Sequence, residues 1–117
     1  MGRLSTHVLD TARGRPAQGI AVRLYRLSKA GPQLVCDTLT NADGRTESPL
    51  LSGEAFTEGT YEVVFAVGAY LRATAQVDGD RLFLDDVPVR FGVTDAAQHY
   101  HVPLLLSPYG YSTYRGS

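Results

Sequence analysis

The chain has 117 residues with a formal net charge of -1, and 44% of these residues are hydrophobic. This length suits one modest core, so we expect a single domain over residues 1–117. The near-neutral charge argues against nucleic acid as a partner, and no apolar stretch approaches the ~20 residues that would span a membrane.

The first half of the chain alternates apolar and polar residues with a period of two, which is typical of half-buried β-strands. We predict strands over residues 4–10, 20–27 and 34–40. Turns are predicted at residues 11–19, 29–32 and 41–44, and the last of these carries the Asp43-Gly44 pair that favours a tight turn. Arg45 follows directly on that turn.

The second half continues this pattern with one interruption. We predict strands over residues 60–67, 84–93, 100–106 and 111–115, the last after a turn at 107–110. Residues 68–77 have the spacing of a short helix, with Tyr70, Leu71 and Thr74 near one face. Short strands joined by tight turns, with little helix to cover a parallel sheet, favour an antiparallel all-β sandwich of two sheets.

Two of the three histidines share one face of the strand at 100–106. Side chains alternate across a strand, so the core face is predicted to carry Tyr100, Val102, Leu104 and Leu106. His99 and His101 then point away from the core. His7 alternates in the same way on the first strand and could meet the other two histidines.

The three histidines allow two interpretations from the residues alone. Each is compatible with an ordinary polar surface position. A His-x-His pair with a distant histidine can also ligate zinc and leave one position for water. No Asp, Glu or Cys lies close in sequence to complete or orient such a site, so we predict no metal there.

The C-terminal segment keeps a strand-like pattern up to the final residue. Termini are usually poorly ordered and polar, whereas this one ends in Tyr114-Arg115-Gly116-Ser117. An edge strand whose tyrosine rings cover apolar surface would account for this pattern. The alternative, which we favour, is that the terminus forms part of a site.

Two longer stretches resemble a known family. HVLD at residues 7–10 is followed after three residues by GRP at 14–16, and YHVPLLLSPYGYS occupies residues 100–112. Together they resemble the transthyretin-like family, and within it the 5-hydroxyisourate hydrolases of purine degradation. His7, His101 and the terminal YRGS are the markers that separate these hydrolases from the hormone carrier, which has lysine and threonine at the two histidine positions and a longer tail.

The resemblance implies a Greek-key β-sandwich with one short α-helix, assembled as a homotetramer, a dimer of dimers with active sites in a central channel. It also implies an enzyme of urate degradation. The strand-like start after Met1, without a secretory signal pattern, favours a cytoplasmic location.

The resemblance also implies the reaction and its residues. The substrate would be 5-hydroxyisourate, whose cyclic amide is hydrolysed to 2-oxo-4-hydroxy-4-carboxy-5-ureidoimidazoline without a cofactor. The implied catalytic residues are His7, Arg45, His101 and Ser117, where Arg45 corresponds to the arginine of the family's Asp-Gly-Arg turn. The histidines would activate water, Arg45 would bind the carbonyl oxygen, and His99, Tyr114 and Arg115 would help His7 and Arg45 bind substrate.

Two other functions remain open at this point. A channel-forming carrier of small aromatic ligands would bind without turnover. A zinc hydrolase using all three histidines would lose its activity to chelators.

Overall fold

The computed structural model describes residues 1–116, and Ser117 lies outside this range. Within it, the strands are β1 (Arg3–Asp10), β2 (Arg15–Pro16), β3 (Ala21–Ser28), β4 (Gly31–Leu39), β5 (Leu51–Ser52), β6 (Gly59–Ala66), β7 (Asp86–Val93), β8 (His99–Ser107) and β9 (Gly110–Thr113). The helices are the 3₁₀ turn η1 (Gly53–Ala55) and α1 (Val67–Ala73). The short elements β2, β5 and η1 were not predicted, because two or three residues are too few to show a period.

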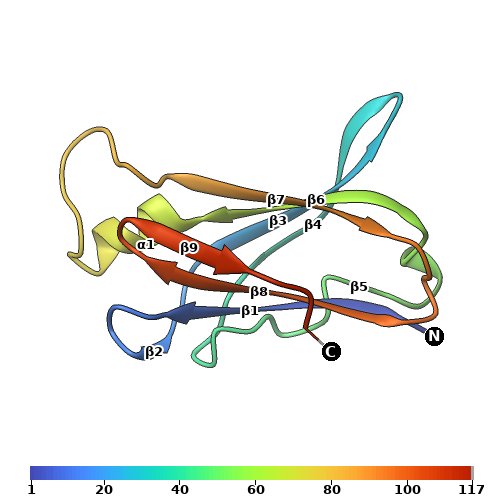
Figure 1. The fold of residues 1–117 in the computed structure, drawn as a ribbon, viewed down its shortest axis with the longest axis horizontal. Helices are drawn as coiled ribbons and strands as arrows, with labels where there is room; N and C mark the ends of the chain where they lie inside the picture. The colour runs from blue at the N-terminus through green and yellow to red at the C-terminus, as the bar shows by residue number, and fades with distance from the viewer. Residues whose placement is uncertain (117) are drawn as a thin grey trace.

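The strands form two sheets that face each other as layers, with α1 at one end (Figure 1). One sheet has the order β2-β1-β8-β9, with β5 also paired to β1, and the other has the order β4-β3-β6-β7. The predicted sandwich with one short helix is therefore confirmed. One pair departs from the antiparallel prediction, because β1 and β8 run parallel over their whole length. They come from opposite ends of the chain, so no hairpin dictates their relative direction.

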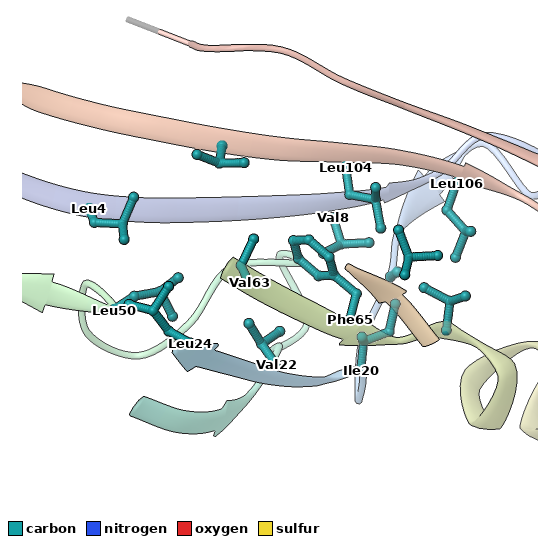
Figure 2. Close-up of a cluster of buried hydrophobic side chains, with 14 of the residues drawn as sticks. Leu4, Val8, Ile20, Val22, Leu24, Leu50, Val63, Phe65, Leu104 and Leu106 are labelled. Atoms are coloured by element: carbon teal, nitrogen blue, oxygen red, sulfur yellow. The ribbon is translucent and has the colours of Figure 1, made fainter. Parts of the chain in front are cut away.

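The core lies between the two layers and is built by the predicted alternation. Figure 2 shows leucine, valine, isoleucine and phenylalanine side chains from both sheets meeting there. The predicted core face of β8 is confirmed, since Tyr100, Val102, Leu104 and Leu106 are all buried. Leu4 and Val8 of β1 are buried on the same side. The odd-numbered residues of β1 and β8 therefore project from the outer face of this sheet.

Helix α1 ends four residues earlier than predicted. Thr74 caps it, and Ala75 adopts a left-handed backbone with φ 57° that cannot continue a helix. The helix is fixed by Tyr70, whose hydroxyl donates a 2.6 Å hydrogen bond to the buried carboxylate of Asp10 at the end of β1. At 7 residues, α1 is far too short to cross a membrane, and none of the helices within residues 1–116 could do so.

One turn is shorter than predicted, and another is confirmed and positions residues of the site. The β3–β4 turn uses only Lys29 and Ala30, because Gly31 (φ 103°) already pairs with Ser28. The predicted turn at 41–44 is confirmed by a 2.9 Å hydrogen bond from Gly44 N–H to the Asn41 carbonyl. Gly44 has φ 74°, and its carbonyl accepts a 2.8 Å hydrogen bond from Val8 N–H, so this turn docks onto β1.

Candidate active site

The outer face of the β1–β8 pair brings together residues from the two ends of the chain. In the parallel register, Ser5 lies beside His101 and His7 beside Pro103. The two histidines are therefore diagonal neighbours on one face, and strand spacing and rise place their Cα atoms roughly 8 Å apart. Both imidazoles are half-buried. Two such groups can act on one small molecule between or above them.

His101 is held at three points. Its Nδ1 lies 2.8 Å from the Ser5 hydroxyl oxygen. Its carbonyl accepts a 2.7 Å hydrogen bond from Gly116 N–H, which folds the C-terminal segment back over β8. A Cβ added at Gly116 would lie 2.7 Å from His101 Cδ2, so the glycine backbone passes directly over that edge of the ring. The orientation of this imidazole is therefore closely defined.

His7 is oriented by the docked turn. Its Nε2 lies 2.8 Å from the carbonyl oxygen of Asp43. A carbonyl oxygen can only accept, so Nε2–H is the donor and the lone pair of the neutral ring lies on Nδ1. The turn that positions Arg45 thus also sets the tautomer of His7.

Electrostatics favour a neutral His101. Burial lowers the pKa of His101 from its ordinary value of 6.5, the positive charge of Arg45 and that of a protonated His7 lower it further, and an interaction with the Ser5 backbone acts in the opposite direction. A neutral imidazole can take up a proton, as a general base must. The arginine that has this effect is exposed and follows the docked turn.

A groove of about 200 Å³ is lined by both Ser5, the neighbour of His101, and Arg45. Its wall also includes Arg3, at the start of β1. Arg3 is paired in register with His99, which is exposed and lies on the same outer face as His101. The outer face therefore carries two guanidinium groups that could bind carbonyl or carboxylate oxygens.

Tyr114 and Arg115 lie elsewhere in the chain. The Arg115 guanidinium carbon is 3.9 Å from the ring centroid of Tyr100, a residue of the core face, and Arg115 donates a 2.8 Å hydrogen bond to Gln98. Both terminal residues line a separate groove of about 270 Å³ with Tyr100 and Val102. A single chain thus brings His7, His101, Ser5 and Arg45 together, but not Tyr114 and Arg115. The predicted role of Ser117 falls outside the described residues.

Sequence reasoning missed three residues that shape this site: Ser5, Asp43 and Gly116. Ser5 was identifiable only as an outward residue two positions before His7. Its contact with His101 spans 96 residues of sequence, so it depends on the β1–β8 pairing. Within residues 1–116, no three His, Cys, Asp or Glu side chains gather closely enough to hold a metal ion, so the three histidines do not form one ligand cluster in the protomer.

Comparison with known proteins identifies the family of the chain. The sequence model of the HIUase/Transthyretin family matches residues 4–116. The chain belongs to this family. It is 58% identical to the 5-hydroxyisourate hydrolase 2 of Rhizobium meliloti over 116 residues, which cover 99% of this chain and 97% of that protein.

Solved structures of both branches of the family share the fold. The 5-hydroxyisourate hydrolase of Klebsiella pneumoniae matches with a TM-score of 0.81 and 32% identity over all of both chains. A sea bream transthyretin in complex with thyroxine matches with a TM-score of 0.86 and 27% identity, covering 97% of this chain and 94% of that one. Curated relatives between 46% and 58% identity are named hydrolases. The chain is therefore placed on the enzymatic branch of the HIUase/Transthyretin family.

Proposed function

We propose that this protein hydrolyses 5-hydroxyisourate to 2-oxo-4-hydroxy-4-carboxy-5-ureidoimidazoline. The observation that carries the proposal is the pair of oriented histidines on the outer face of β1 and β8, with Arg45 beside them. The names of the relatives supply the substrate. The groups on this face supply what the hydrolysis of an amide requires.

The reaction is the addition of water to a carbonyl carbon of the six-membered ring, followed by cleavage of the bond from that carbon to nitrogen. The oxygen of water ends in the new carboxyl group, and the freed nitrogen becomes the end of the ureido group. A base must take a proton from water, the carbonyl oxygen must be stabilised as it gains negative charge, and the leaving nitrogen must receive a proton.

His7 and His101 are proposed to orient the water and to take its proton. Each neutral ring carries one free lone pair. Arg45 is proposed to bind the carbonyl oxygen, because a guanidinium is always charged and donates in a planar fork. As the bond from carbon to nitrogen breaks, the protonated histidine gives its proton to the leaving nitrogen, so the enzyme ends as it began.

The remaining predicted site residues are proposed to act in a homotetramer, a dimer of dimers. The outer face of β1 and β8 carries the half-buried residues Leu9 and Leu105 beside the histidines, and such a mixed face suits a shared channel. In this assembly the terminal residues Tyr114, Arg115 and Ser117, together with His99, would contact substrate in a neighbouring site.

The test is the ultraviolet decay of 5-hydroxyisourate, prepared freshly from urate, with and without the protein and in the presence of EDTA. We expect acceleration in proportion to protein concentration that EDTA does not abolish. Loss of the acceleration with EDTA, and its recovery with zinc, would contradict the metal-free mechanism. No acceleration with either would reject the hydrolase and leave a carrier that binds without turnover.

Variants then test the residues. Replacing His7 or His101 by alanine is expected to lower kcat about 10²- to 10⁴-fold, the usual contribution of a general base. Arg45→Ala is expected to lower kcat/KM as well. The matched control is Arg23→Ala, an exposed arginine on the other sheet. Near wild-type turnover in both histidine variants would remove these residues from the mechanism.

A further inference from the structure

Ser5 presents a hydroxyl group to His101 from a strand at the other end of the chain. Alternation along β1 sends the neighbouring Thr6 hydroxyl inward, where it donates a 2.7 Å hydrogen bond to the Val102 carbonyl. Ser5 points outward instead, and the parallel register sets it directly beside His101. The Ser5 oxygen lies 2.8 Å from His101 Nδ1.

The other contacts of His101 fix its backbone and cover one ring edge, but they do not involve Nδ1. The Gly116 N–H fixes the His101 backbone, and the Gly116 backbone covers the Cδ2 edge. Burial and two nearby positive charges lower the pKa of His101 and so favour its neutral form. A neutral imidazole carries one proton on one of two nitrogens. The Ser5 hydroxyl can accept from Nδ1–H or donate to a bare Nδ1, so the direction of this hydrogen bond is tied to the tautomer of His101.

We propose that Ser5 is a positioning residue whose Oγ accepts a hydrogen bond from His101 Nδ1–H and thereby leaves Nε2 free to take a proton from water. This assignment rests on the proposed function. When water gives its proton to Nε2, the resulting imidazolium keeps its Nδ1–H on Ser5, and Nε2 later returns the proton to the leaving nitrogen. A group that holds the second nitrogen of a catalytic histidine has the same effect in other hydrolases.

Ser5→Ala removes the acceptor, so neutral His101 is expected to populate both tautomers and more than one ring orientation. A single neutral hydrogen bond corresponds to about a five- to tenfold change in population, and we expect kcat to fall by this factor. KM is expected to stay within about twofold, because Ser5 is proposed to act through His101 and not on the substrate. Ser5→Thr keeps the hydroxyl, and threonine is favoured in strands. Ser5 lines a groove of about 200 Å³, toward which the added methyl group can be directed.

The experiment uses the full chain in four forms: wild type, Ser5→Ala, Ser5→Thr and Ser107→Ala. Ser107 is the matched control, since it is a part-buried serine of β8 whose hydroxyl donates to the Gly110 carbonyl and not to a histidine. Nitrogen-15 spectra of labelled histidine, assigned with single histidine variants, report which nitrogen of neutral His101 carries the proton. Steady-state kinetics with 5-hydroxyisourate report kcat and KM on the same samples.

We expect Nδ1–H in the wild type, in Ser5→Thr and in Ser107→Ala, and a mixture of tautomers with reduced kcat in Ser5→Ala. A wild-type spectrum with the proton on Nε2, or a Ser5→Ala variant with unchanged spectrum and kcat, would overturn the assignment. The two readouts separate this inference from the proposed function. If no form accelerates hydrolysis while the tautomer still depends on Ser5, then the reaction is wrong and the control of His101 by Ser5 stands.

Discussion

Adding one methyl group at Gly116 should disturb the site without disrupting the rest of the fold. In Gly116→Ala, the added Cβ would lie 2.7 Å from His101 Cδ2 and 3.2 Å from its Cβ and Cγ. Nonbonded carbons normally lie about 3.5–4.0 Å apart, so the two groups must separate by about 1 Å. The Ser5 contact and the Gly116 N–H bond oppose this movement, so either the ring turns or the terminal bridge opens.

We expect Gly116→Ala to lower catalytic activity more than it lowers the stability of the fold. A displacement of about 1 Å at a catalytic group can lower activity by ~10²-fold, so we expect kcat/KM to fall by about 10- to 100-fold. Loss of the terminal hydrogen bond is worth about 1 kcal/mol, or about 4 °C in Tm for a chain of this size. The assay is hydrolysis of 5-hydroxyisourate beside thermal unfolding at one fixed protomer concentration.

The control is Gly110→Ala in the same terminal hairpin. A Cβ there would meet only the Ser107 hydroxyl oxygen, at an ordinary 3.7 Å, so activity should stay near wild type. If Gly116→Ala were as active as Gly110→Ala, the C-terminal segment would not constrain His101, and the reasoning from this close approach would be wrong.

Two further predictions concern pH and the Asp10–Tyr70 hydrogen bond. Burial and the charges of Arg45 and His7 lower the pKa of His101. Where His101 takes the proton from water, kcat/KM should stay high below pH 6.5 and fall only as pH drops through the lowered value; an acid limb at or above 6.5 that persists in His7→Ala would contradict this. Tyr70→Phe removes the 2.6 Å hydrogen bond to Asp10, and we expect the free energy of unfolding to fall by about 1.5–3 kcal/mol, or Tm by about 6–12 °C. The control Tyr109→Phe, at a 75% exposed residue, should change the stability little. Burial raises the pKa of Asp10, but hydrogen bonds from Tyr70, Arg13 and Gln76 outweigh it and hold that pKa below 3.8. The bond therefore stabilises the fold fully above pH 3.8, and the difference between Tyr70→Phe and wild type should shrink as pH falls through the lowered pKa; an undiminished difference in acid unfolding curves would show that the ionised carboxylate is not responsible.

The sequence by itself determined the strands, their faces and the turn that carries Arg45. A period of two needs only local alternation, which is why the core face of β8 and the outward direction of His7 and His101 follow from it. The Asp43-Gly44 turn is equally local, since glycine accepts the positive φ that the turn requires.

Only the tertiary structure decided which of these residues meet. Three features join residues that are far apart in sequence or on opposite faces of a sheet. They are the parallel pairing of β1 with β8, the contact of Ser5 with His101 and the packing of Arg115 on the Tyr100 ring. Local patterns fix the direction of a side chain relative to its own strand, but they carry no information about which distant strand lies beside it. That choice comes from burying both sheets in one core, and it is what assembles the histidines, their hydroxyl partner and the terminal glycine into one site.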